Sequence, residues 1–289
     1  MRLGKGGFVA LLGILASTTL HPTSTWGATI RDDQPDSSYL DLAKTLDYAP
    51  VGTFVGGLSG SATLIAPDWV LTAAHNLVAA TSATFTINGT TYTSTELYRN
   101  PGWNGNALNG YDFGLVHLST LVTGVAPATL YNGSSEFGQI ATFVGFGLTG
   151  TGLTGYRTLD NQERAFQNII DGDFGNPSVL LGCDFDNPHS TADNAFGDAI
   201  PLSLEGSVAP GDSGGGVFLT ISSQTYLAGV ISFVGATDGS ANADYGDVNG
   251  FGRVSTFVPW IMSTIPEPSV STLLAGAGLV MLFGRYVGK

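Results

Sequence analysis

The sequence predicts an all-β protein, either a sandwich or a barrel. Short segments rich in Val, Ile, Thr and aromatic residues recur between turn signals such as Pro67-Asp68, Asn88-Gly89, Asn132-Gly133 and Asp238-Gly239. No repeat of about 20 to 50 residues is evident, which disfavours propellers and solenoids. With 289 residues, of which 43% are hydrophobic and 11% charged, the chain can bury the core of one large or two small domains.

Eight segments have the composition and length of strands. They are 61–65, 69–72, 84–87, 90–95, 113–118, 141–146, 217–221 and 227–233. Asn88-Gly89 joins two of them and predicts a hairpin with a type I′ turn, because that turn needs positive φ at both central residues. A helical period occurs at 258–265, and a weaker one at 162–170.

Charge and cysteine content exclude several classes of protein. The net charge of −13 argues against nucleic acid and against charge-driven binding to an anionic membrane, since both need basic patches. The single cysteine, Cys183, cannot form an internal disulfide, so stability outside the cell must come from the core or from bound ions.

The N-terminal segment has the order of a secretory signal. Arg2 and Lys5 precede an apolar run at 8–20, and small and polar residues follow as far as Gly27-Ala28. We therefore expect residues 1–28 to be a signal peptide and the protein to be exported. A retained N-terminal anchor is the alternative, although the apolar run is short for a spanning helix.

The C-terminal segment, 266–289, resembles the PEP-CTERM sorting tag. Pro266-Glu267-Pro268-Ser269 leads into an apolar stretch at 270–283, and Arg285 and Lys289 follow. The resemblance implies processing by exosortase-type sorting machinery in a Gram-negative bacterium. It also implies an extracellular or envelope-associated protein, with transient or permanent membrane contact through this segment. A plain C-terminal membrane anchor is the alternative.

Gly211-Asp212-Ser213-Gly214-Gly215 is the candidate nucleophile segment. Glycines beside a serine leave its hydroxyl exposed and allow the N–H groups of Gly211 and Ser213 to point together at an oxyanion. A glycine-rich turn is the alternative reading in a chain with 41 glycines. The α/β-hydrolase pattern is excluded because that fold needs a histidine after the serine, and no histidine follows Ser213.

A catalytic base must therefore come from upstream. His21 falls in the expected signal peptide, His117 lies within a strand pattern as an ordinary surface or packed histidine, and His189 lies in a loop. His75 directly follows a strand pattern, and Asp112 begins another, where its carboxylate can orient a histidine.

Three blocks together resemble the trypsin-like serine proteases, the chymotrypsin-fold family. They are Thr72-Ala73-Ala74-His75, Tyr111-Asp112-Phe113-Gly114-Leu115 and the segment from Gly211 to Gly215. The resemblance implies two packed antiparallel six-stranded β-barrels with a short C-terminal helix. The protease domain would cover 29–265, with the first barrel at about 29–135 and the second at about 136–262.

The resemblance also implies roles for these residues. Ser213 would attack the scissile peptide bond of a protein or peptide substrate, His75 would transfer the proton, and Asp112 would orient His75. The N–H groups of Gly211 and Ser213 would form the oxyanion hole. A catalytically silent surface or extracellular-matrix binding protein on the same fold is the alternative.

Specificity and activation residues follow from the same resemblance. Ser207 would lie at the base of the substrate pocket, Ser232 would pair with the substrate backbone, and Val234 would narrow the pocket in favour of small or medium apolar P1 residues. Asp212 would receive the new N-terminal ammonium in an activation salt bridge. Asn76 stands where the family has a cysteine.

No cofactor is expected, but two acidic clusters leave structural calcium open. The first comprises Asp184, Asp186, Asp193 and Asp198, and the second comprises Asp238, Asp244 and Asp247. Their oxygen density suits calcium, but neither has the spacing of an EF-hand, and solvated loops are the better interpretation.

Overall fold

The computed structural model describes residues 27–158, 160 and 162–266. These residues are mostly β, with one closed six-stranded barrel, a seven-stranded half-barrel sheet and a short helix near the C-terminal end, which confirms the predicted fold class. Most of the expected signal peptide and sorting segment lies outside the described residues. No described helix is both long and apolar enough to cross a bilayer.

The chain divides into two compact units at Thr256. The first unit holds all of the described strands, and helix α2 (Val254–Thr264) crosses the division. The expected helical period at 258–265 lies within α2 except for its last residue, which confirms that assignment.

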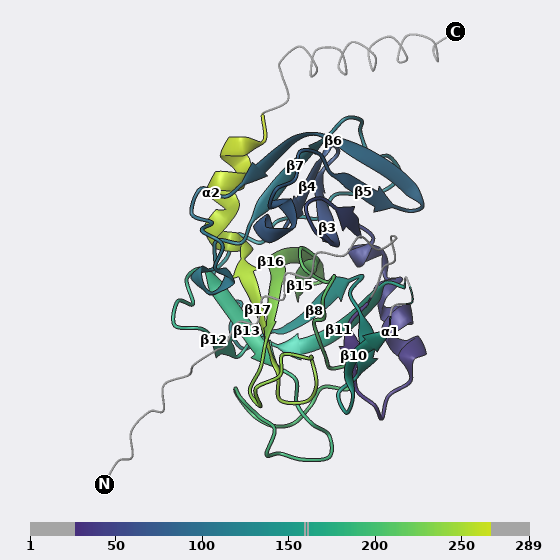
Figure 1. Cartoon of the computed structure of the whole chain (residues 1–289), viewed down its shortest axis with the longest axis vertical. Helices are drawn as coiled ribbons and strands as arrows, with labels where there is room; N and C mark the ends of the chain where they lie inside the picture. The colour runs from purple at the N-terminus through teal and green to yellow at the C-terminus, as the bar shows by residue number, and fades with distance from the viewer. Residues whose placement is uncertain (1–26, 159, 161, 267–289) are drawn as a thin grey trace. The chain divides into compact units, whose positions relative to one another are not determined.

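The first barrel contains six antiparallel strands in the order β2-β3-β4-β7-β6-β5 (Figure 1). Its strands are β2 (Val51–Val55), β3 (Ser59–Ala66), β4 (Trp69–Thr72), β5 (Thr84–Ile87), β6 (Thr90–Arg99) and β7 (Gly114–Leu118). The predicted β5–β6 hairpin is confirmed: Ile87 pairs with Thr90, and the turn residues Asn88 and Gly89 have φ of 48° and 73°.

The second sheet has the strand order β11-β8-β15-β16-β17-β13-β12. Its strands are β8 (Ile140–Gly145), β11 (Arg164–Ile169), β12 (Gly172–Asp173), β13 (Leu180–Asp184), β15 (Gly216–Ile221), β16 (Gln224–Gly235) and β17 (Val248–Arg253). All eight predicted strand segments overlap strands of the barrel or of this sheet.

A smaller four-stranded sheet has the order β10-β9-β1-β14. It consists of β1 (Thr29–Ile30), β9 (Thr149–Thr151), β10 (Gly155–Thr158) and β14 (Gly206–Ser207). Thr29 therefore pairs with both Gly150 and Ser207, so the start of the described chain is held against the segment that precedes Ser213.

The weaker helical prediction at 162–170 is wrong. This segment forms β11, which pairs in continuous register with β8 from Arg164–Gly145 to Ile169–Ile140. Buried residues lie close together along it, because Ala165 and Phe166 are both inaccessible. Burial of adjacent residues removes the alternation that marks a strand, and a short apolar run is then easily mistaken for a helix.

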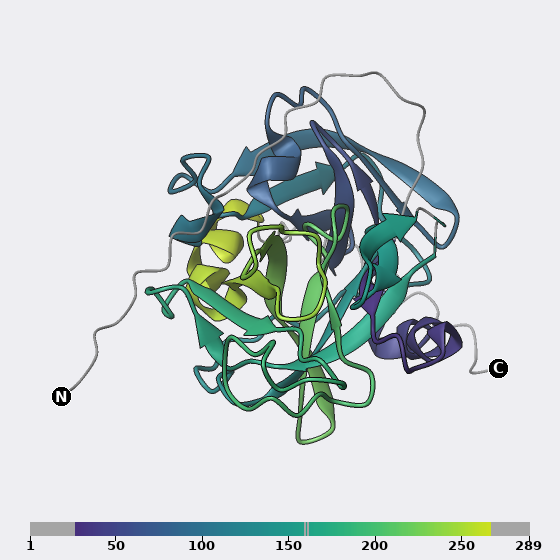
Figure 2. The ribbon, with the colours of Figure 1, turned by 60° about the horizontal axis from the view of Figure 1, so that its bottom comes forward.

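Four short helical segments connect the strands. They are α1 (Asp36–Ala43), η1 (Leu46–Tyr48), η2 (Ala74–Leu77) and η3 (Ala107–Asn109). Helix α1, which the sequence did not predict, packs beside β11 (Figure 2). Of these segments, η2 carries His75.

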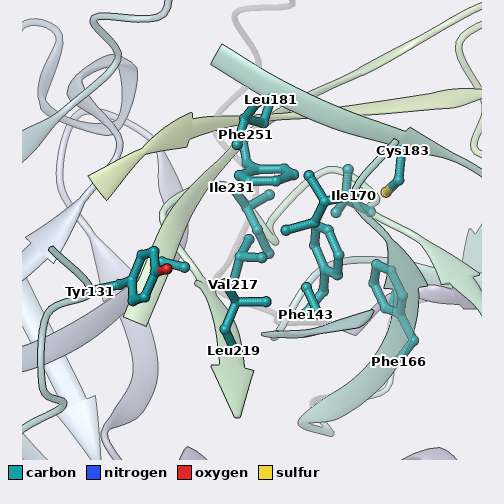
Figure 3. Packing of buried hydrophobic residues seen from close by; sticks show 14 of the residues in the cluster. Tyr131, Phe143, Phe166, Ile170, Leu181, Cys183, Val217, Leu219, Ile231 and Phe251 are labelled. Carbon is teal, nitrogen blue, oxygen red and sulfur yellow. The ribbon is translucent and has the colours of Figure 1, made fainter. Parts of the chain in front are cut away.

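Each β assembly has its own hydrophobic core. Phe54, Leu64, Val70, Phe85 and Val116 belong to the core of the first barrel. In the second core Phe143 stacks on Phe166 with ring centroids 4.9 Å apart and meets Phe251 edge to face (Figure 3). Two separately packed cores give a rigid frame for loops that meet between them.

Candidate active site

His75 and Asp112 meet because two paired strands end beside each other. Strand β4 pairs with β7, with Thr72 opposite Gly114. His75 follows β4 on the 3₁₀ segment η2, and Asp112 precedes β7. Gly110, two residues before Asp112, has φ of 75°, which lets the chain turn toward β7.

The Asp112 carboxylate accepts three hydrogen bonds. Oδ1 accepts from the His75 backbone N–H at 2.9 Å, and Oδ2 lies 2.6 Å from His75 Nδ1 and accepts from Ser232 Oγ at 2.6 Å. Asp112 is 1% exposed. Because a carboxylate only accepts, Nδ1 carries the proton in the resting pair, and Nε2 is left as the acceptor.

The nucleophile segment has two amides without acceptors. The N–H groups of Asp212, Gly214 and Gly215 donate to Ala209, Ile231 and Asp212 carbonyls respectively. Within the described residues, the N–H groups of the other two residues of this segment, Gly211 and Ser213, have no such partner. These are the two amides that the sequence nominated for the oxyanion hole, and they are available to an incoming oxyanion.

Glycine is required at position 214. Its φ is 87°, and a Cβ there would lie 2.2 Å from both the Ser61 carbonyl oxygen and Thr72 Oγ1. The segment can approach β3 and β4 this closely only without a side chain.

Hydrogen bonds from the first barrel hold the nucleophile segment in place. The Ser213 carbonyl accepts from the Ser61 N–H and from Asn76 Nδ2, both at 2.8 Å. Ser61 Oγ donates to the Gly211 carbonyl at 2.9 Å. Asn76, noted in the sequence only as a replaced cysteine, directly follows His75 and therefore ties the His75 segment to Ser213.

The Ser213 side chain is half-buried and forms no hydrogen bond to the described residues, His75 included. The His75 side chain is 22% exposed, so its ring is accessible from solvent. A catalytic hydrogen bond between a serine hydroxyl and a histidine ring is often long in a free enzyme and tightens when substrate binds.

Asp212 is buried directly before Ser213 in the chain, and no described residue forms an ion pair with it, although the charge of Arg164 acts on it from a distance. Its carboxylate accepts from the N–H groups of Gly147 at 2.6 Å and Ala209 at 2.8 Å, and the Ala28 amide also bonds to it. Burial raises the pKa of Asp212 to about 7, although the three amides oppose the shift. The Ala28 nitrogen thus already lies at the carboxylate that the sequence nominated as the activation anchor.

The predicted pocket residues lie together, with one that the sequence missed. Ser207 is fully buried, and its Oγ donates to Asn249 Oδ1 at 2.7 Å. Asn249 Oδ1 also accepts from the Val208 N–H at 2.9 Å, and Asn249 pairs across the sheet with Val234. The Ser232 hydroxyl bonds to Asp112, and a register shift at Ser232 interrupts the pairing of β16 with β17.

The other two described histidines have partners of their own. His117 stacks on Trp69 with ring centroids 4.6 Å apart, as expected for a packed histidine on a strand. His189 lies in a loop, and its Nε2 is 3.0 Å from Asp32 Oδ1.

The two acidic clusters differ in geometry. Asp238, Asp244 and Asp247 each bring one carboxylate oxygen within 4.8 Å of the others, which is the spread of ligands around one cation. In the first cluster, Asp184 accepts from the backbone amides of Ala195 and Phe196 and so organises its own loop. Exposed acidic loops commonly have such spacing without an ion.

The sequence model of the family described as Trypsin matches residues 51–261, which is well over half of the chain. Among curated proteins, no sequence matches the chain.

Proposed function

Since the chain belongs to the trypsin family of serine peptidases, we propose that it is an exported serine endopeptidase that works through an acyl-enzyme. The observation that carries the proposal is the Asp112 carboxylate, which holds both the backbone and the ring of His75. A surface-binding protein without catalysis has no need for a buried aspartate in that position.

In the proposed mechanism Ser213 Oγ attacks the scissile carbonyl carbon, and His75 Nε2 takes the hydroxyl proton. The Asp112 carboxylate stabilises the imidazolium that forms, and the amides of Gly211 and Ser213 stabilise the oxyanion. His75 then gives the proton to the leaving amine as the C–N bond breaks. A water molecule attacks the acyl-enzyme in the same way, and the proton returns to Ser213.

The proposed specificity is for small or medium apolar P1 residues. Ser207 at the base of the pocket carries no charge, so it offers no partner to Lys or Arg. Val234 and Asn249 lie opposite each other across the sheet, and the Asn249 amide is held by Ser207 and Val208. In this proposal Val234, beside Asn249 on the neighbouring strand, narrows the pocket and so favours a short P1 side chain.

Maturation in this proposal occurs between Gly27 and Ala28, one residue before the expected end of the signal peptide. Cleavage there converts the Ala28 amide into an ammonium that bonds to the buried Asp212 carboxylate, so removal of the signal peptide also activates the enzyme. Export and contact with sorting machinery remain part of the proposal, because they rest on the terminal sequence patterns.

Covalent labelling of Ser213 by a fluorophosphonate tests the proposed activity. We expect wild-type protein that begins at Ala28 to be labelled and Ser213→Ala in the same form to show no labelling. His75→Ala should be labelled more slowly by about three orders of magnitude or more, because the hydroxyl then has no general base. His117→Ala is the matched control, since that ring stacks on Trp69 and should not alter labelling. A folded wild-type protein that resists the reagent would favour the silent binding protein instead.

A further inference from the structure

A cavity of about 460 Å³ lies beside the first barrel, and the proposed mechanism does not use it. Its lining comes from the end of α1 and the chain that leads into β2, from the end of β5 and the β5–β6 turn, and from Gly124, Val125, Phe146 and Glu163. None of His75, Asp112 and Ser213 contributes to it. Its volume falls within the range of about 300 to 1,000 Å³ that is usual for ligand pockets.

Glu163 places an unpaired carboxyl group in the wall of this cavity. Its Oε1 is buried without a partner, and within the described chain neither oxygen accepts a hydrogen bond. The neighbouring Arg164 cannot serve it, because its guanidinium bonds to Asp36 at 2.7 Å and Asp160 at 2.6 Å. A buried carboxyl without a partner is costly, which favours a ligand that supplies one.

Only one other lining residue, Lys44, is charged. Its Nζ lies 2.8 Å from Asp41 Oδ1, and its side chain is 74% exposed, so it is engaged on the surface. The remaining walls are largely apolar or small, and include Val51, Ile87 and Val125.

We propose that this cavity binds a lysine or arginine side chain of an extended polypeptide, with its cation at Glu163 and its aliphatic stem against the apolar walls. Such side chains bury their methylene groups along apolar surface while their cationic end pairs with an anion. The net charge of −13 also attracts basic segments from a distance. This site is separate from the triad and does not depend on the proposed peptidase activity.

The cavity adjoins the support of the oxyanion segment. Phe146 lines the cavity, and its N–H donates to Ser61 Oγ at 3.1 Å. The same Ser61 hydroxyl donates to the Gly211 carbonyl. A basic segment bound here therefore contacts Phe146, whose N–H bonds to the serine hydroxyl that holds Gly211.

Binding is expected to release a proton. Burial alone raises the pKa of Glu163 to about 8, so the carboxyl is mostly protonated at neutral pH. A bound ammonium stabilises the carboxylate, and the displaced proton passes to the buffer. With a pKa of about 8, roughly 0.9 proton is released per ligand at a pH of about 7.

The test uses the full chain with Ser213→Ala, which prevents cleavage of the probe. Isothermal titration calorimetry at neutral pH, in phosphate and in Tris, measures affinity and proton release for acetyl-Ala-Val-Lys-Val-Ala-amide. The comparison peptide has norleucine in place of lysine. We expect the lysine peptide to bind at least about tenfold more tightly than the norleucine peptide, with proton release close to one.

Glu163→Gln should weaken binding of the lysine peptide by about tenfold or more and abolish proton release. Asp173→Asn is the matched control, because Asp173 is an exposed carboxylate outside the cavity, and it should change neither quantity. Equal affinity for the two peptides, unchanged binding by Glu163→Gln, or no binding at millimolar peptide would each overturn the proposal.

A measurement on the chain with native Glu163 keeps the test decisive if Glu163→Gln does not fold. The sequence contains five glutamates, so carboxyl-¹³C-labelled glutamate gives a tractable NMR spectrum. One signal should titrate near pH 8 in the free protein and move back toward the ordinary glutamate range when the lysine peptide binds. A titration unaffected by the peptide would contradict the proposal.

Discussion

At the residue scale, polar side chains whose partners lie far away in sequence were the hardest to predict. His75, Asp112 and Ser213 stand in recognisable local patterns, so the sequence nominated them. Asn76 and Asn249 do not. Asn76 acts on the Ser213 carbonyl 137 residues away, and Asn249 faces Val234 through a register that includes the shift at Ser232. Neither a contact between such distant residues nor a register shift can be read from composition, so neither residue was assigned a role.

Asn249 offers a direct test of the proposed pocket. Asn249→Ala shortens the side chain that faces Val234 and binds Ser207, so the pocket should deepen and accept longer apolar P1 residues. We expect kcat/KM for P1 Leu relative to P1 Ala to rise about 10-fold or more, since one or two methylene groups are worth about 1–3 kcal/mol in such pockets. A P1 peptide library measures this ratio, and Asn104→Ala on an exposed loop is the control. A wild-type preference for Lys or Arg would show that the pocket has been assigned incorrectly.

At the scale of elements, predictions succeeded where alternation was clean and failed where burial changed the period. Strands β4 and β5 were predicted residue for residue. Strand β11 was mistaken for a helix because adjacent residues on it are buried. Helix α1 was missed because only Tyr39 and Ala43 of its eight residues are buried, which leaves little helical periodicity in the sequence.

Strand β1 is the element on which activation depends in our proposal. It pairs with β9 and β14 and thereby holds the Ala28 nitrogen at the Asp212 carboxylate. A new ammonium at Ala28 would lower the pKa of Asp212 from about 7 and form a buried ion pair. Losing one partner of such a pair typically costs about 3–5 kcal/mol.

We therefore expect a chain that begins at Ala28 to exceed the uncleaved chain in kcat/KM by about 100-fold or more, which corresponds to about 3 kcal/mol. Asp212→Asn should remove this advantage, because a neutral amide cannot form the ion pair with the new ammonium. N-terminal sequencing of the active secreted protein should begin at Ala28. An active form that begins well away from Ala28 would refute this route.

At the scale of the whole molecule, buried carboxyl groups make stability depend on pH. Burial raises the pKa of Glu163 and Glu205 to about 8 and that of Asp171 and Asp186 to about 7. A folded chain with raised carboxyl pKa values binds more protons than the unfolded chain in the interval between the two values. Its stability therefore falls as the pH rises through that interval. In the opposite direction, ion pairing with Arg253 lowers the pKa of Glu136 despite its burial, and that contribution is lost in acid.

Glu205 isolates this effect. It is 2% exposed, and its carboxylate accepts from the N–H groups of Asp186 and Leu202. Its pKa rises from an ordinary 4.5 to about 8, so its contribution to stability is present below about pH 4.5 and is lost progressively up to about pH 8.

Urea unfolding should therefore give a lower free energy of unfolding at pH 8 than at pH 5. Glu205→Gln, which keeps one acceptor oxygen and cannot ionise, should reduce that difference by on the order of 2 kcal/mol. Glu96→Gln is the control because Glu96 is exposed on β6, and an equal reduction in both variants would mean that the pH dependence arises from overall charge and not from burial of Glu205.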